Sequence, residues 1–203
     1  MNEIARPPHW HDTTQTADGL PRLRWTLAEF ERLSELGFFG GIDRERERLE
    51  LVDGELLPMQ AKGGRHEWVR LKLQKHLTLA LGAAFDVLSE PGWRPGGELY
   101  LEPDILVCGS GSRPTEVRPA DVLLVIEVAD SRLGYDKGLK AHIYATLGVR
   151  EYWVVDANTL DTTVHLSPSA EGYANVTTLP ASATLSPTLL PALAVSLGGL
   201  GIA

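Results

Sequence analysis

Cysteine is almost absent from this chain of 203 residues, and the one that occurs, Cys108, lies inside an apolar run. This excludes a disulfide framework and a zinc site built from thiolates, and it fits a reducing cytoplasm. Long hydrophobic runs are missing as well. The N-terminal stretch lacks the apolar core of a signal peptide, and the weakly charged stretch 189–203 is too short and too interrupted by proline and glycine to span a membrane. We therefore expect a cytoplasmic protein without a membrane-spanning segment.

Positive charge is also scarce, since the formal net charge is -8. A polyanion would have to bind a local basic patch rather than the field of the whole molecule. The densest basic segment contains Arg65, Arg70, Lys72 and Lys75. It coincides with a helix predicted over 66–81 by apolar residues at every fourth position, and such a helix could lie along a phosphate backbone. A solvated amphipathic face is an equally good interpretation of the same pattern.

Apolar residues make up 43% of the chain, enough for a full core. Residues 1–24 show no sustained period and are predicted to form a mobile arm, whereas 25–203 are predicted to form a single domain. Thr26 with Glu29 predicts a capping box that opens a helix ending near residue 36. Alternating residues on both sides of Asp53-Gly54 then predict a β-hairpin.

The rest of the chain alternates between strands and helices, which indicates an α/β fold. Short strands are predicted at 87–90, 97–101, 104–108, 122–128 and 151–156, with an edge strand at 164–166. A helix predicted over 136–147 and stopped by Gly148 separates two of these strands. Strand, helix and strand in this order predict a right-handed crossover between parallel strands.

Two of the apolar strands carry a carboxylate at a position where burying an apolar residue would cost less free energy. Asp104 begins one of them, and Glu127 lies near the end of another. If the strands are neighbours, these carboxylates and the Val128 carbonyl could bind a magnesium ion, which usually takes one or two carboxylates and fills its shell with water and phosphate. Lys140, on the helix after Glu127, is our candidate for the cation that stabilises developing charge at a phosphodiester.

Each of these residues has a structural interpretation too. Asp104 could cap a turn, and Glu127 could form a salt bridge with Lys140 or Arg132. Lys140 could pair with Asp136 on the surface. The aromatic residues nearby, Tyr144, Tyr152 and Trp153, could simply belong to the core. A sugar hydrolase with the two carboxylates as acid and base would be a different function, but no feature supports sugar binding.

Three segments resemble the Uma family of restriction-endonuclease-like proteins within the PD-(D/E)XK nuclease superfamily. They are LEPDILV, the long run LLVIEVADSRLGYDKGLKAHIYATLGVREYWVVD, and LELVDGELLPM followed by His66. The resemblance spans roughly residues 25–165. One departure stands out: the superfamily's lysine would fall at position 129, where this chain has Ala129, and Lys140 matches a lysine that has moved to the following helix.

The resemblance implies a restriction-endonuclease-like mixed β-sheet flanked by helices, with an N-terminal helix and hairpin. It implies that Asp104 and Glu127 bind Mg2+ or Mn2+ and that the protein cleaves DNA. Recurrent family positions are also matched by Glu50 or Glu55, from the hairpin, and by His66. Glu50 would help to place the water or a second ion. His66 would orient phosphate or water, or make a structural hydrogen bond. A homodimer would suit cleavage of both strands. The alternative function is an inactive module that keeps the fold and binds nucleic acid or protein.

Overall fold

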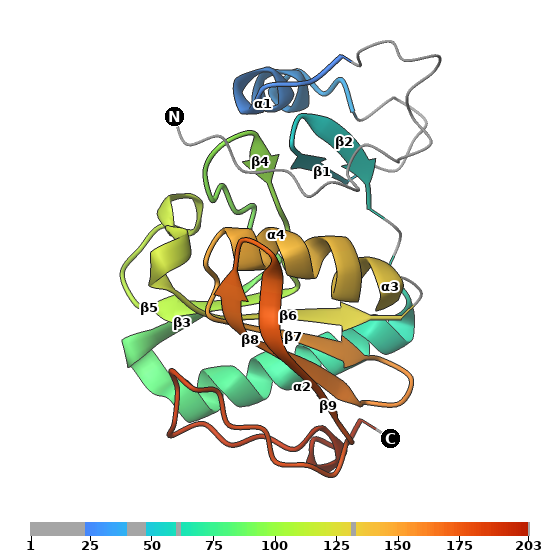
Figure 1. Cartoon of the computed structure of the whole chain (residues 1–203), viewed down its shortest axis with the longest axis vertical. Helices are drawn as coiled ribbons and strands as arrows, with labels where there is room; N and C mark the ends of the chain where they lie inside the picture. The colour runs from blue at the N-terminus through green and yellow to red at the C-terminus, as the bar shows by residue number, and fades with distance from the viewer. Residues whose placement is uncertain (1–22, 40–47, 60–61, 131–132, 203) are drawn as a thin grey trace. The chain divides into compact units, whose positions relative to one another are not determined.

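The structure, a computed structural model, describes residues 23–39, 48–59, 62–130 and 133–202. Its backbone divides into two compact units (Figure 1). The first consists of Met1–Gln60 and Gly96–Tyr100, and the second of Ala61–Pro95 and Leu101–Ala203. The predicted N-terminal arm lies outside the described residues as far as residue 22.

The helix of the first unit, α1 (Leu27–Glu35), begins where the sequence predicts. Thr26 Oγ1 accepts the backbone N–H of Glu29, and the Glu29 carboxylate accepts the backbone N–H of Thr26, which completes the capping box. Phe30 is the buried residue of this helix, and its ring lies 5.0 Å from the ring of Tyr100.

The sheet of the first unit has three strands in the order β2-β1-β4. These are β1 (Leu49–Val52), β2 (Glu55–Pro58) and β4 (Leu99–Tyr100), all antiparallel. The predicted hairpin of β1 and β2 is confirmed. Asp53 and Gly54 form its turn with φ angles of 50° and 78°, as a two-residue type I′ turn requires.

A six-stranded mixed sheet organises the second unit, in the order β3-β5-β6-β7-β8-β9. The strands are β3 (Phe85–Ser89), β5 (Ile105–Gly109), β6 (Val122–Ala129), β7 (Glu151–Asp156), β8 (Thr162–Ser169) and β9 (Gly172–Leu179). Strands β6 and β7 are parallel, and the other neighbouring pairs are antiparallel. The predicted mixed sheet and its parallel crossover are therefore confirmed.

Helices cover both faces of this sheet (Figure 1). Helix α2 (Gly64–Leu81) buries Val69, Leu73 and Leu77 fully against apolar residues of the central strands. The crossover on the other face consists of α3 (Leu133–Tyr135), a π-helical turn (Asp136–Lys140) and α4 (Ala141–Thr146). This helix therefore begins slightly earlier than predicted and contains a wider turn that the sequence pattern does not reveal.

One prediction about the C-terminal part is wrong. The strand at 164–166 is not an edge strand, because β8 lies between β7 and β9. The sequence of β9 conceals it, since its exposed residues form one continuous run in which polar residues and the apolar Ala174 and Val176 follow no alternation. The segment after β9 also contributes to the core, because Leu190, Leu193 and Ile202 are buried in the same apolar cluster as α2. Within the described residues, no helix combines the length and apolarity needed to cross a bilayer.

Candidate functional site

Strand pairing brings Asp104 and Glu127 together in the second unit. Asp104 directly precedes β5, and the antiparallel register pairs Ile105 with Ile126, so Asp104 and Glu127 lie side by side. The backbone N–H of Asp104 donates to Glu127 Oε2 at 3.3 Å. Each of the two residues is only 4% exposed. The condition that the sequence left open, that the two strands be neighbours, is therefore met.

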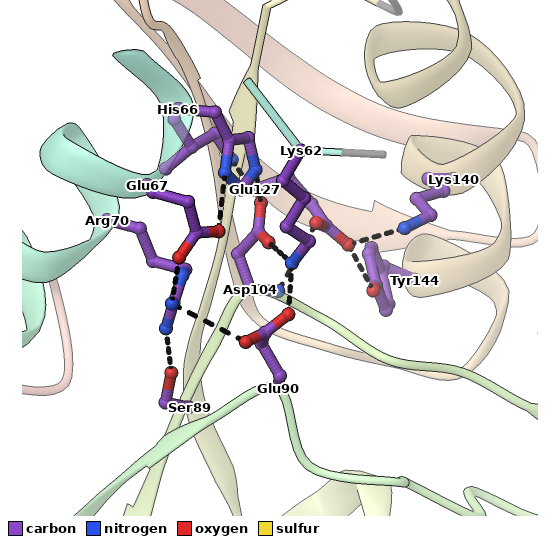
Figure 2. Close-up of polar contacts among 11 residues, drawn as sticks. Lys62, His66, Glu67, Arg70, Ser89, Glu90, Asp104, Glu127, Lys140 and Tyr144 are labelled. Carbon is purple, nitrogen blue, oxygen red and sulfur yellow. Dashed lines mark hydrogen bonds and ion pairs between the residues drawn. The ribbon is translucent and has the colours of Figure 1, made fainter. Parts of the chain in front are cut away.

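Three donors surround the carboxylate of Asp104 (Figure 2). Its Oδ2 accepts the backbone N–H of Val128 at 2.8 Å and lies 3.0 Å from His66 Nε2, which donates because an ionised carboxylate can only accept. Its Oδ1 accepts from Lys62 Nζ at 2.6 Å. Burial alone would raise the pKa of Asp104, but the hydrogen bond from His66 and the charge of Lys62 outweigh it and hold this pKa well below its ordinary value.

The carboxylate of Glu127 binds two side chains of the crossover helix (Figure 2). Lys140 Nζ and the Tyr144 hydroxyl each lie 2.9 Å from Glu127 Oε1. Lys140 is 5% exposed and Tyr144 is fully buried, so the ion pair is shielded from water. The two residues are four apart and share one helix face, as the spacing predicts. Lys140 therefore reaches Glu127, an arrangement that suits both a catalytic lysine and the structural salt bridge considered above.

A second layer of charged residues adjoins Asp104. Lys62 Nζ also contacts Glu90 Oε1, and Arg70 lies 3.5 Å from Glu90 Oε2. Arg70 donates to Glu67 at 2.6 Å and to the hydroxyl of Ser89. The hydrogen bond to Arg70 lowers the pKa of Glu67. Lys62 and Glu90 were missed by the sequence reasoning. Lys62 lies outside regular elements, where no periodicity marks a side chain as pointing inward, and Glu90, which was predicted to end a strand, follows β3 instead.

Glu90 also has an unusual backbone conformation. Its φ is 47°, in the left-handed region that few residues other than glycine adopt. Its N–H donates to the carbonyl oxygen of Asp104 at 3.1 Å. This hydrogen bond joins the loop after β3 to the residue that precedes β5, and it places Glu90 beside Asp104.

The carboxylates of the site are donors that suit a hard cation such as Mg2+ or Mn2+. Asp104 and Glu127 supply two adjacent carboxylates, and Mg2+ commonly takes one or two, with water for the remaining positions. Among the described residues, no group of three or more His, Cys, Asp and Glu side chains is placed to hold a metal. Asp104 and Glu127 are the residues that would hold an ion, and metal binding by them stays a prediction. Val128 offers its N–H to Asp104, while a role for its carbonyl stays a prediction.

The basic residues of α2 differ in their surroundings. Arg65 donates to the carbonyl oxygens of Ala157 and Ile202 at 2.9 and 3.0 Å, and Arg70 belongs to the cluster around Glu90. Lys72 Nζ lies 4.5 Å from the centre of the Trp68 ring, and Lys75 is exposed. Nucleic-acid binding by these four residues stays a prediction, and two of them already have structural partners.

The acids of the hairpin lie in the first unit. Glu50 is 3% exposed within β1, and Glu55 begins β2. A role for Glu50 in placing a water or a second ion stays a prediction. His66, in contrast, is part of the cluster: it lies in the first turn of α2, its Nε2 contacts Asp104, and its Nδ1 lies 3.4 Å from Glu67.

Comparisons with known proteins agree with this architecture. The model of the Uma2 family, described as "Putative restriction endonuclease", matches residues 27–198. Four chains of solved structures match as well. One is the crystal structure of "a putative nuclease belonging to DUF820" from Anabaena variabilis ATCC 29413, which is 16% identical and superposes with a TM-score of 0.64 over 87% of this chain and 97% of that one. At this identity the likeness concerns the fold. No curated protein matches the sequence.

Proposed function

The chain belongs to the Uma2 family, and on that premise we propose that it is a metal-dependent nuclease that hydrolyses DNA phosphodiester bonds. The observation that carries the proposal is the pair of buried carboxylates, Asp104 and Glu127, side by side with a lysine bound to each. Buried acids are costly unless they are paired, so a cluster of this kind points to a retained function. Mg2+ or Mn2+ would supply the polarisation of the phosphate and the lowering of the pKa of a bound water.

The protein's own residues would hold and orient the reactants. Asp104 and Glu127 bind the ion, and His66 and the Val128 N–H fix the orientation of the Asp104 carboxylate through Oδ2. Tyr144 fixes Glu127 in the same way through Oε1. Lys140 places its ammonium beside this carboxylate, where it can stabilise the negative charge that develops on the phosphate.

A cleavage assay tests the proposal. Supercoiled plasmid, duplex and single-stranded oligonucleotides are incubated with the protein and with its Asp104→Asn and Glu127→Gln variants, with and without Mg2+ or Mn2+. We expect metal-dependent cleavage, reduced by about a hundredfold or more in both variants.

The matched control is Glu151→Gln. Glu151 is a glutamate of the same sheet, 2% exposed, whose oxygens accept from Trp153 Nε1 and the Thr188 N–H. This variant should lose stability but keep its cleavage per folded molecule. Undiminished cleavage by the Glu127→Gln variant would refute the proposed site.

A second candidate function is a nuclease-fold module that binds nucleic acid or protein without cleaving it. The observation that favours this binding module is that both carboxylates already have a counter-ion: Asp104 pairs with Lys62, and Glu127 pairs with Lys140. Metal titration separates the two functions, because an ion that binds the native state raises the melting temperature by mass action. Neither cleavage nor metal-dependent stabilisation is expected of the binding module.

A further inference from the structure

Lys62 binds the second carboxylate oxygen of Asp104, Oδ1. Asp104 Oδ2 accepts hydrogen bonds from Val128 and His66, so Oδ1 is the oxygen that remains for another partner. Lys62 Nζ occupies it at 2.6 Å and contacts Glu90 at the same time (Figure 2). The ammonium therefore lies between two carboxylates, where a small cation would also be attracted.

An ammonium and a divalent ion would compete for Asp104 Oδ1. Mg2+ binds oxygen at about 2.0–2.1 Å and keeps several waters, so an ion on Asp104 Oδ1 would displace a nitrogen that lies 2.6 Å from the same atom. Their like charges also repel each other strongly at such separations. From this geometry we propose that Lys62 is a built-in competitor for the metal site and that metal binding releases its ammonium from Asp104. The inference rests on the proposed function and adds a residue that regulates the same site.

The two lysines of the cluster differ in a way that singles out Lys62 for release. The side chain of Lys140 is 7% exposed and lies within helices, 5.8 Å from the centre of the Tyr135 ring. The side chain of Lys62 is 14% exposed and precedes the N-cap of α2, so it is not fixed by a helical backbone. When Lys62 leaves, Glu90 keeps a positive neighbour, since Arg70 lies 3.5 Å away.

Metal binding to the full chain tests this inference. The Mg2+ and Mn2+ affinities of the unsubstituted protein, Lys62→Gln and Lys62→Met are measured by calorimetry and by the metal-dependent shift of the melting temperature. We expect both variants to bind the ion roughly tenfold more tightly or better, because the competing charge is gone. The matched control is Lys75→Gln, which removes an exposed lysine of α2 and should leave the affinity unchanged.

A second measurement uses the unsubstituted protein and so does not depend on how well the variants fold. An amine-reactive reagent is added with and without saturating Mg2+, and labelling of each lysine is followed by mass spectrometry. Lys62 should be labelled faster with Mg2+, while Lys75 should be labelled at the same rate. Unchanged labelling of Lys62 in the metal-bound protein would overturn the inference.

The outcomes separate this inference from the proposed function. If the protein binds metal but the Lys62 variants bind it no more tightly, Lys62 is not a competitor and the proposed function stands. If the Lys62 variants lose affinity for DNA while their metal affinity is unchanged, Lys62 contacts phosphate instead, and the inference is wrong. If neither the protein nor its Lys62 variants bind Mg2+ or Mn2+, both proposals are refuted.

Discussion

Replacing Lys140 by methionine tests whether the ion pair with Glu127 is as well shielded as its geometry indicates. The two side chains are 7% and 5% exposed, and the atoms that join them lie 2.9 Å apart. Methionine has a similar length and leaves little empty volume, so the main effect of Lys140→Met is the loss of a charge. Glu127 would then be a buried carboxylate that keeps its hydrogen bonds from Tyr144 and the Asp104 N–H but has lost its counter-ion.

The magnitude follows from the burial. Removing one partner of a buried ion pair costs about 3–5 kcal/mol, whereas an exposed pair loses only about 0.2–1 kcal/mol. The low exposure of both side chains places Lys140→Met in the first class. The double variant Lys140→Met with Glu127→Gln should be more stable than the single variant, because no charge is left buried alone. A coupling energy of about 0.5–3 kcal/mol is the expected size for two residues in direct contact.

Urea unfolding of the four proteins in this cycle, followed by circular dichroism, gives the free energies of unfolding. Lys137→Met is the control within the same π-helical turn, and it should change stability by less than about 0.5 kcal/mol because Lys137 is not part of the cluster. A loss below about 1 kcal/mol for Lys140→Met, or additive effects in the cycle, would refute the interpretation that this pair is shielded from water.

Three further perturbations have defined outcomes. The pKa of Asp104 is lower in the folded protein than its ordinary value of 3.8. In acid the unfolded chain therefore binds more protons than the folded protein. The stabilisation by the Asp104 carboxylate is complete above about pH 4–5 and is lost as the pH falls. Urea unfolding at several pH values should therefore show that Asp104→Asn destabilises the protein less at pH 3 than at pH 7. Gly54→Ala should destabilise the first unit by about 1 kcal/mol or more, because Gly54 has a φ of 78° and an added Cβ would lie 2.8 Å from Arg24 Cβ. Faster hydrogen exchange of the β1 and β2 amides would report this loss of stability. Arg65→Met should lower the free energy of unfolding by about 1–3 kcal/mol, because it removes the donor to the carbonyl oxygens of Ala157 and Ile202. An unchanged melting temperature would contradict this prediction.

The central part of the fold could be predicted because its strands are buried on both faces. Strand β6 is almost continuously apolar, and Glu127 is conspicuous within it for that reason. Glycine and turn residues located the hairpin and the end of the crossover helix. Strand β9 could not be predicted, because its exposed residues mix polar and apolar side chains and follow no alternation. The π-helical turn was missed for a similar reason, since no residue type requires it.

The site was predictable only where regular elements carry it. The spacing of four residues between Lys140 and Tyr144 follows from helical geometry, and both do reach Glu127. Lys62 and Glu90 lie in connecting segments, whose conformation is set by tertiary contacts rather than by a repeating pattern. Arg70 illustrates the opposite error: a basic residue on a helix suggests an exposed patch, but its side chain is 13% exposed and lies among Glu67, Ser89 and Glu90.

The path of the chain between the two units has a consequence for its synthesis. Strand β4 belongs to the first unit, yet it follows α2 and β3 of the second unit along the chain. On the ribosome, the β1–β2 hairpin must therefore wait for its third strand until Tyr100 has been made, roughly two to eight seconds later at typical rates of elongation. A two-stranded hairpin is marginally stable in water. The first unit is thus encoded mainly at the start of the chain but can complete its sheet only after the segment Ala61–Pro95 of the second unit has been made.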